Sequence, residues 1–297
     1  MKVIILAQKD SYALRRLANA ITLRQHHLKI ISPIDCTVRI DGAHAEVIYY
    51  SQPLSADVVL LRCIAYTRHG ITIVRAFETY VANQLKLSGA VCINDPEAKL
   101  RAHDKFLTLQ ALNNSGIPVP PTFLTWNQTN LESIAYNHLG FPLILKMNEG
   151  TWGMGVTRAD SLESARSIFD TIKGMERVFT LQKYVAEAKG RDIRVFVLGK
   201  RVIGAIKRTA RVHDFRSNIH QGGRAESVHL PSSYADVAIR AADVMGLDIA
   251  GVDILETNEG PKVIEVNPSP GFESIESATG VDVATQIVQY IEQRVKN

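Results

Sequence analysis

The sequence has little cysteine, and the cysteines that it has are scattered. Its 297 residues include 3 cysteines, an odd number with no CxxC pair, which gives no support to a disulfide framework or a zinc site. Long apolar runs are missing as well. The run at residues 3–7 is too short for the core of a signal peptide, and no segment approaches the ~20 apolar residues of a membrane-spanning helix. We therefore expect a cytoplasmic protein with no membrane association.

The sequence also lacks a block of positive charge and two common nucleotide-binding motifs. Lys and Arg total 34 against 30 Asp and Glu, a net charge of +4, and the basic residues are too dispersed for a DNA track. Direct DNA binding is not expected, whereas an anionic ligand suits this balance. No Gly-x-Gly-x-x-Gly follows the first apolar run and no Gly-x-x-x-x-Gly-Lys occurs, so a conventional Rossmann or P-loop site is not expected.

Up to about residue 94, short apolar runs alternate with segments of helical periodicity. This alternation predicts a small α/β domain with a parallel sheet. The predicted strands are residues 3–7, 28–31, 58–61 and 90–93, and the predicted helices are residues 11–26 and 68–87.

A different pattern begins at Asp95-Pro96, which is typical of a helix start. One helical stretch is expected from there to residues 113–116, followed by a stiff connector with three prolines. Strands beyond it come as hairpin-like neighbours, and Gly199-Lys200 is typical of a tight turn. These strands are residues 122–125, 143–147, 180–184, 193–198 and 201–206. The second domain, residues 95–297, is therefore expected to be α+β.

Two apolar runs near the C-terminal end predict a hairpin. Residues 258–260 separate them and are typical of a three-residue loop with Gly in the left-handed position. With that loop, Thr257 pairs with Pro261. The same register places Asp253 directly opposite Glu265, on one face and with Cβ atoms roughly 5 Å apart.

Oxygen-bearing side chains gather at this strand end. Asn267 lies two residues beyond Glu265 and so shares its face. Two opposed carboxylates would repel each other unless a cation lay between them. Carboxylate and amide oxygens suit Mg²⁺ or Mn²⁺ rather than zinc. A solvent-facing polar edge is the alternative interpretation.

Two other segments carry groups that suit a nucleotide. Lys146 ends an apolar strand and leads into a loop with Gly at 150, 153 and 155, whose backbone N–H groups could approach phosphate. A plain hairpin turn is the alternative. Residues 182–185 and the following Asp192-Ile-Arg194 could serve a nucleobase and a ribose.

Taken in order, these features resemble the ATP-grasp superfamily, and most closely its RimK-type α-L-glutamate ligases. The resemblance spans nearly the whole chain. It is strongest over residues 191–223, where Asp192-Ile-Arg and Asp214-Phe-Arg-Ser-Asn-Ile-His-Gln-Gly-Gly have the RimK form. It implies a pre-ATP-grasp α/β domain at residues 1–94 and an α+β ATP-grasp fold at 95–297. Within the latter, a lid subdomain is expected at about 121–182 and a metal-binding subdomain at about 183–297.

The resemblance also implies roles for individual residues. Those implied to bind ATP are Lys105, Lys146, Gly153, Gly155, Gln182, Lys183, Tyr184, Val185, Asp192, Arg216, Ser217 and Asn218. Those implied to face the phosphates or the acyl intermediate are Arg208, Arg216 and Asn218. Asp253, Glu265 and Asn267 would hold two Mg²⁺ or Mn²⁺ ions, with Glu265 bridging them. Lys183 departs from the family pattern, since RimK sequences commonly have Glu there.

The implied activity is ATP-dependent ligation of a carboxylate to an amine through an acylphosphate, with release of ADP and phosphate. L-Glutamate would be added to the C-terminal carboxylate of an acidic peptide or protein, such as a small-subunit ribosomal protein, or to polyglutamate. A homo-tetramer is the family expectation. The alternatives are an amino-acid ligase that acts on a carrier protein or cofactor, as in lysine biosynthesis, and a nucleotide-binding module without turnover.

Overall fold

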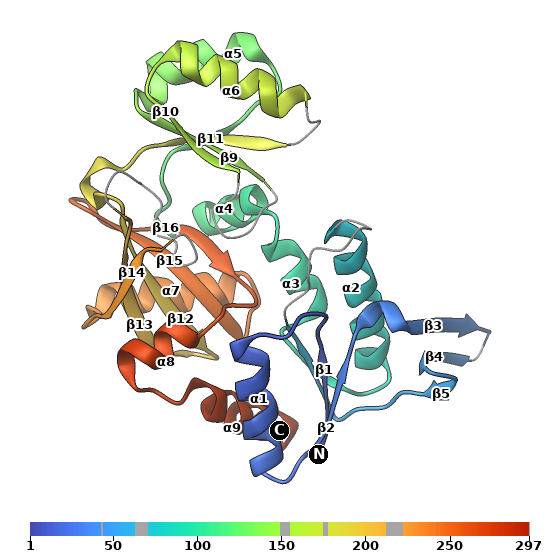
Figure 1. Cartoon of the computed structure of the whole chain (residues 1–297). Coiled ribbons are helices and arrows are strands. Elements are labelled where there is room, and N and C mark those ends of the chain that lie inside the picture. The colour runs from blue at the N-terminus through green and yellow to red at the C-terminus, as the bar shows by residue number, and fades with distance from the viewer. Residues whose placement is uncertain (43, 63–70, 149–154, 175–177, 212–221, 297) are drawn as a thin grey trace.

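The computed structural model describes residues 1–42, 44–62, 71–148, 155–174, 178–211 and 222–296. The described residues form four sheets, with helices packed on each of the three larger ones (Figure 1). None of their helices is both long enough and apolar enough to cross a bilayer.

The N-terminal part is built on a parallel sheet of order β2-β1-β6-β7. Its strands are β1 (Lys2–Leu6), β2 (His27–Ile31), β6 (Val58–Leu61) and β7 (Val91–Ile93). Alternate residues of β1 face opposite sides. Val3 and Ile5 pack in the cluster that contains α1 (Tyr12–Leu23), and Ile4 and Leu6 pack in the cluster that contains α2 (Ile71–Leu87). The predicted parallel α/β domain is confirmed.

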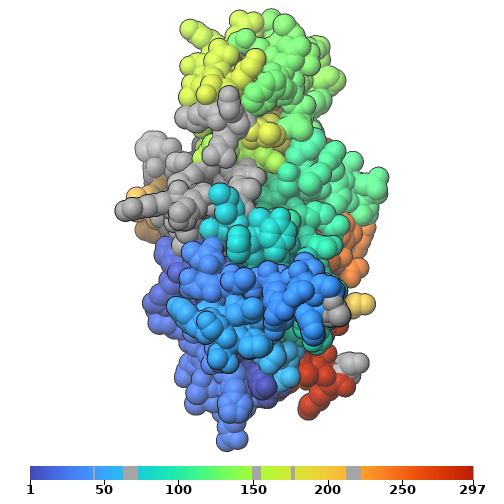
Figure 2. Space-filling model, turned by 90° about the vertical axis from the view of Figure 1, so that its right-hand side faces the viewer, coloured from blue at the N-terminus to red at the C-terminus, as the bar shows by residue number. Residues whose placement is uncertain are grey.

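A small antiparallel sheet was not anticipated from the sequence. It consists of β3 (Cys36–Asp41), β4 (His44–Tyr49) and β5 (Gln52–Pro53), and it follows the short 3₁₀ turn η1 (Pro33–Asp35). In Figure 1 it projects from the side of the parallel sheet, and in Figure 2 it lies on the same outer face as α2. The alternation of strands and helices is therefore interrupted between β2 and β6.

The predicted single helix after Asp95 is two helices, α3 (Pro96–Ala102) and α4 (Lys105–Asn114). Asp95 caps α3, accepting from the N–H groups of Glu97 and Ala98, both at 3.0 Å. Asp104 caps α4, accepting from the N–H of Leu107 at 2.8 Å. The second cap starts a new helix, which is why the stretch is not continuous.

The segment predicted to be the lid subdomain, for which we keep the name lid, contains an antiparallel sheet of order β10-β9-β11-β8. Its strands are β8 (Thr122–Leu124), β9 (Leu143–Met147), β10 (Val156–Ala159) and β11 (Phe179–Lys183). The helical segments α5 (Gln128–Ile134), η2 (Ala135–Leu139) and α6 (Leu162–Gly174) cover it, and they share an apolar core with β9 and β11. Figure 1 shows the lid standing apart from the rest of the chain, above α4 and the central sheet.

The central sheet has the order β14-β13-β12-β15-β16. Its strands are β12 (Arg191–Leu198), β13 (Arg201–Thr209), β14 (Arg224–Ser227), β15 (Ile249–Thr257) and β16 (Gly260–Asn267), and the 3₁₀ turn η3 (Ala186–Ala188) leads into it. On one face lies α7 (Ser232–Val244), while α8 (Glu273–Thr279) and α9 (Val283–Lys296) lie on the other. The antiparallel pairing confirms the α+β expectation, and Gly199-Lys200 forms the predicted turn.

Candidate active site

The predicted carboxylate pair is present, although the turn that was expected to produce it is not. Asp253 pairs with Glu265 across β15 and β16. The loop, however, has two residues, because Thr257 pairs with Gly260 rather than with Pro261. The register shifts by one residue between Asp253 and Ile254, and this bulge restores the pairing farther along.

Asp253 of β15 is held by two arginines, Arg194 of the adjacent strand β12 and Arg208 of β13, one strand farther. It is 3% exposed. Arg194 donates from Nε and Nη2 to its two carboxylate oxygens, both at 2.7 Å, and Arg208 Nη2 lies 2.8 Å from Oδ2. Burial alone would raise the pKa of Asp253, but the two guanidinium groups outweigh burial and hold that pKa below its ordinary value. The carboxylate is therefore charged throughout the neutral range.

Arg208 connects Asp253 to Asp192. Its Nε and Nη2 donate to the two oxygens of Asp192, both at 2.6 Å, and both side chains are buried. Burial lowers the pKa of Arg208, and the two carboxylates raise it by more, so the net shift is upward. The residue predicted to hold the ribose and the one predicted to face the phosphates are thus ion-paired with each other.

Lys146, on β9 of the lid, lies near the charged residues Asp192 and Asp253 of the central sheet. Its Nζ donates to Gln182 Oε1 at 2.6 Å, and Gln182 Nε2 donates to Thr122 Oγ1 at 2.8 Å, so three adjacent lid strands share one hydrogen-bonded chain. Burial lowers the pKa of Lys146 to about 8; the nearby Glu265 opposes that shift, and the ammonium of Lys105 adds to it. The amine is therefore within electrostatic reach of the carboxylates on the central sheet.

The first turn of α4 is fixed to the end of β9. Asn148 Nδ2 donates to Asp104 Oδ2 at 2.7 Å, and the N–H of Phe106 donates to Asn148 Oδ1 at 2.9 Å. Lys105 lies between Asp104 and Phe106, at the start of α4. These two hydrogen bonds of Asn148 set where α4 begins relative to Lys146. Lys146 lies two residues before Asn148 in the chain.

Of the remaining predicted residues, some lie in the described part of the chain and four lie outside it. Gly155 has φ +76°, and a Cβ there would lie 2.4 Å from Met147 Sδ, so this position requires glycine for backbone reasons. Lys183 donates its N–H to the carbonyl of Pro121 at 2.9 Å, and Arg158 lies over the ring of Tyr184 at 5.8 Å. Four predicted residues lie outside the described part of the chain: Gly153, Arg216, Ser217 and Asn218.

Two sequence profiles match nearly the whole chain. The RimK PreATP-grasp domain matches residues 1–98, and the RimK-like ATP-grasp domain matches residues 102–291. The chain belongs to the RimK-like ATP-grasp family. It is therefore an ATP-grasp ligase, and its fold implies ATP and a divalent metal as cofactors.

Full-length relatives agree with this assignment. The chain is 39% identical over 296 residues to a probable alpha-L-glutamate ligase of Picosynechococcus sp., covering 99% of this chain and 96% of the relative. It is 39% identical, with the same coverage, to a ribosomal protein bS6--L-glutamate ligase of Salmonella paratyphi B.

Solved structures share the RimK-like fold at lower identity. The ATP-grasp ligase PsnB, complexed with a phosphomimetic variant of its minimal precursor, Mg and ADP, superposes with a TM-score of 0.78 at 20% identity, covering 99% of this chain and 98% of that one. A RimK domain protein from Sphaerobacter thermophilus gives 0.71 at 22% identity, covering 98% and 99%.

Asp253, Glu265 and Asn267 differ in how many of their side-chain oxygens are available to bind a magnesium-type ion. No described residue donates a hydrogen bond to Glu265, whose carboxylate is open to a ligand. Asn267 Oδ1 accepts one bond, from the N–H of Ser269 at 2.9 Å. Asp253 has three of its roughly four lone-pair positions in use by arginines. Among the described residues no three His, Cys, Asp or Glu side chains gather as a metal site, and the donor set here is instead two carboxylates and an amide.

Sequence reasoning missed three residues that shape this site. Arg194 was noticed only as part of a motif, although it holds Asp253. Asn148 and Thr122 were not singled out, although they position Lys105 and Gln182. All three act through partners distant in sequence. The contacts of Arg194 and Thr122 follow from strand register, whereas that of Asn148 depends on how helix α4 packs against the end of β9.

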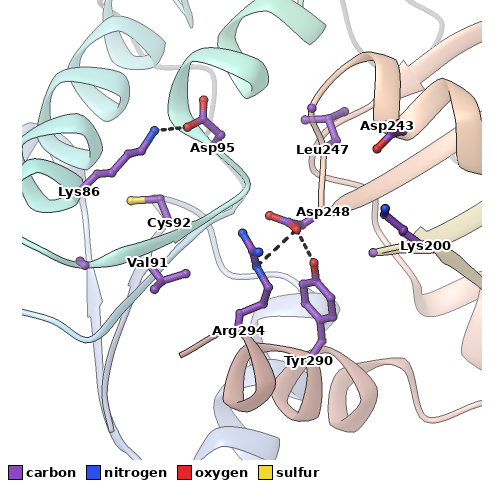
Figure 3. A pocket seen from close by; sticks show the side chains of 13 residues that line it. Lys86, Val91, Cys92, Asp95, Lys200, Asp243, Leu247, Asp248, Tyr290 and Arg294 are labelled. Carbon is purple, nitrogen blue, oxygen red and sulfur yellow. Dashed lines mark hydrogen bonds and ion pairs between the residues drawn. The ribbon is translucent and has the colours of Figure 1, made fainter. Parts of the chain in front are cut away.

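A cavity of ≈ 490 Å³ opens elsewhere, between the N-terminal domain and the region around α9 (Figure 3). No residue predicted for ATP or metal lines it. Several of its polar groups pair with one another: Lys86 Nζ donates to Asp95 at 2.5 Å, and Tyr290 and Arg294 both approach Asp248. The cavity is therefore separate from the RimK-like site.

Proposed function

We propose that this ligase adds L-glutamate to the C-terminal carboxylate of an acidic peptide or protein. The observation that carries the proposal is the 39% identity, over essentially the full chain, to relatives named for glutamate ligation, one of them for ligation to a ribosomal protein. The solved PsnB structures hold precursor peptides, which is in keeping with a peptide acceptor.

The residues around the site have complementary tasks in this proposal. Lys105 and Lys146 take the negative charge of the ATP phosphates. Gln182 is positioned by Thr122 and Lys146, and residues 183–185 beside it would receive adenine. Asp192 would hold the ribose, with Arg208 fixing its carboxylate. Catalysis is then positioning and charge neutralisation, as in other phosphoryl transfers.

The metal would be held by Asp253, Glu265 and Asn267, as two Mg²⁺ or Mn²⁺ ions. Such ions neutralise the phosphate charge and keep attacking and leaving oxygens in line. The terminal carboxylate of the acceptor attacks the γ-phosphate, and ADP leaves. The amine of glutamate then displaces phosphate from the acylphosphate, which forms the new amide bond.

The test uses the enzyme with Mg-ATP, glutamate and a peptide that ends in glutamates, followed by mass spectrometry. Added glutamate units are expected on this peptide, and none on the same peptide with an amidated C-terminus. Extension of both peptides would contradict activation of the terminal carboxylate. Efficient use of lysine in place of glutamate would instead favour a ligase that acts on a carrier protein.

A further inference from the structure

The segment that follows Asn267 cannot continue β16 as a paired strand. Asn267 is the last paired residue of this strand, opposite Gly251 of β15. Pro268 and Pro270 come next, with Ser269 between them, and neither proline has an N–H to donate to a neighbouring strand. Both prolines are buried. Because a buried carbonyl needs a hydrogen-bond donor, their carbonyls must be satisfied by other groups.

Two side chains of the N-terminal domain supply these donors. Asn94 directly follows β7 and Arg62 directly follows β6, and these two parallel strands are paired, so their carboxyl ends lie at the same edge of the sheet. Asn94 Nδ2 donates to the carbonyl of Pro268 at 2.7 Å, and Arg62 Nη2 donates to the carbonyl of Pro270 at 2.8 Å. One edge of the parallel sheet thus holds the loop that follows Asn267.

Asn94 also holds the start of β15. Its Nδ2 donates to the carbonyl of Ile249 at 2.8 Å, and its Oδ1 accepts from the N–H of the same residue at 2.7 Å. The side chain is 2% exposed, and three of the four hydrogen-bonding positions of its carboxamide are in use. Aspartate has the same size but no donor, so the arrangement requires a carboxamide of this length.

A single peptide unit connects Asn94 to Asn267. The carbonyl of Pro268 and the N–H of Ser269 belong to the same planar trans peptide. Its carbonyl accepts from Asn94, and its N–H donates to Asn267 Oδ1 at 2.9 Å. Because the unit is planar, fixing the carbonyl also fixes the direction of the N–H, and the N–H orients the carboxamide of Asn267. Oδ1 keeps a second lone pair that can bind an ion.

Two further contacts hold the same loop. The guanidinium group of Arg62, which is 5% exposed, lies over the ring of Phe272 at 5.9 Å as well as bonding to Pro270. On the opposite side, a Cβ at Gly251 would lie 2.8 Å from Pro270 Cβ. Glycine at this position therefore lets the loop lie directly against β15.

We propose that Asn94 and Arg62 are positioning residues of the metal site. Neither binds the ion itself; they hold the loop whose first peptide orients Asn267. This role rests on the proposed function, in which Asn267 is a metal ligand. Partners that orient a ligand from outside the coordination sphere typically contribute 10- to 100-fold to metal affinity. The N-terminal domain thereby takes part in metal binding, although none of the proposed ligands lies in it.

Titration of the full-length protein with Mn²⁺ tests the proposal without measuring turnover. Free Mn²⁺ is followed by electron paramagnetic resonance at a fixed ADP concentration, and a titration without protein corrects for the ion that ADP binds alone. Asn94→Ala should weaken Mn²⁺ binding roughly 10- to 100-fold. Leu85→Ala is the control, because Leu85 is buried in an apolar cluster made of N-terminal-domain residues alone. It should lower the melting temperature and leave Mn²⁺ affinity unchanged.

Wild-type Mn²⁺ affinity in a folded Asn94→Ala protein would overturn the proposal, and so would an equal loss of affinity in Leu85→Ala. If Asn94→Ala does not fold, Arg62→Met takes its place. It removes a single donor to the same loop, keeps an apolar stem, and should weaken Mn²⁺ binding at least ~3-fold. Unchanged affinity in Arg62→Met would then overturn the proposal.

The same titration in an Asn267→Ala background shows whether the effect passes through Asn267. Asn267→Ala alone should weaken Mn²⁺ binding, and adding Asn94→Ala should weaken it little further, because the two residues act on one oxygen. Losses that add in full would overturn the proposal and leave the metal ligands standing. Wild-type affinity in Asn267→Ala would instead remove Asn267 from the ligand set of the proposed function, and the positioning role with it.

Discussion

At the scale of single residues, the two opposed carboxylates differ in what surrounds them. Asp253 is buried under Arg194 and Arg208, whereas Glu265 is partly exposed and receives no hydrogen bond from the described residues. Removing the charge of Asp253 leaves the buried Arg208 and the partly buried Arg194 short of a partner, while removing that of Glu265 does not. The two positions should therefore separate stability from activity.

Asp253→Asn is expected to lower the free energy of unfolding by about 3 kcal/mol, because breaking a buried ion pair leaves an uncompensated charge. Glu265→Gln should stay within ~0.5 kcal/mol of wild type. Urea denaturation followed by circular dichroism measures both. Equal destabilisation by the two changes would show that the arginines do not depend on Asp253.

Glu265→Gln should nevertheless abolish most turnover. It keeps the shape of the side chain but removes one negative charge where two cations are proposed, so ADP release should fall at least ~100-fold. Glu259→Gln makes the same change in the exposed turn of this hairpin and serves as the control. Near-normal ADP release by Glu265→Gln at saturating Mg²⁺ would remove Glu265 from the site.

Lys146 should make nucleotide binding sensitive to alkaline pH. Its pKa is lowered from 10.5 to about 8 by burial, so the free enzyme loses this charge above about pH 8. The uncharged form suits the folded site, and stability through this group rises as pH increases from about 8 toward 10.5. Bound phosphate favours the charged form, so binding above pH 8 takes up a proton, and affinity falls by up to about tenfold per pH unit.

Titration of a non-hydrolysable ATP analogue between pH 7 and 9.5 measures this dependence. The wild type should bind with constant affinity up to about pH 8 and then progressively weaker. Lys146→Met should bind weakly, and its affinity should vary little with pH. Parallel curves for the two proteins would assign the pH dependence to another group.

At the scale of elements, the lid hairpin contains a position that only glycine fits. Gly155 has positive φ and faces the Met147 side chain. Gly155→Ala should lower the free energy of unfolding by at least ~1 kcal/mol, from backbone strain together with the clash. Gly174→Ala is the matched control, since nothing lies within 4 Å of its Cβ position. Thermal melts compare the two, and similar midpoints would contradict the strain.

Elements were predictable where apolar periodicity was strong and local. The four parallel strands follow from such patterns. The pairing of Asp253 with Glu265 was predicted from a three-residue loop, and it is found because the bulge offsets the shorter turn.

The small sheet of β3, β4 and β5 was not predicted, although Cys36, Val38 and Ile40 alternate with polar residues in β3. That alternation is typical of a half-exposed antiparallel strand, whereas the prediction rested on continuous apolar runs. The two-residue turn was missed because a bulge cannot be read from spacing. The contact between Arg194 and Asp253 depends on the pairing of β12 with β15, which joins residues 59 positions apart.

At the scale of the whole molecule, one apolar core joins the first helix to the last. The cluster that contains Leu17 of α1 also contains Phe196 of β12 and Ile287 of α9. Ion pairs lie at the edge of this core: Arg16 pairs with Glu276, and Arg24 pairs with Glu292. The N-terminal domain and the central sheet are therefore expected to lose structure together.

Leu17→Ala tests this coupling by calorimetry. The side chain is fully buried, and its truncation should cost roughly 2–5 kcal/mol. The melting temperature should fall while the transition shared by the N-terminal domain and the central sheet stays single. A separate early transition, with the central sheet still folded, would show that the two parts are energetically independent.

The packing of α1 against α9 (Figure 1) also has a consequence for synthesis on the ribosome. Helix α1 leaves the exit tunnel early, yet the surface that covers its outer side is made about 260 residues later. At ~5–20 residues per second, that interval is on the order of tens of seconds. During it Leu14, Leu17 and Ile21 have only the parallel sheet to pack against. We expect the nascent N-terminal domain to remain loosely folded, and to bind chaperones that recognise apolar segments, until translation has passed residue 283.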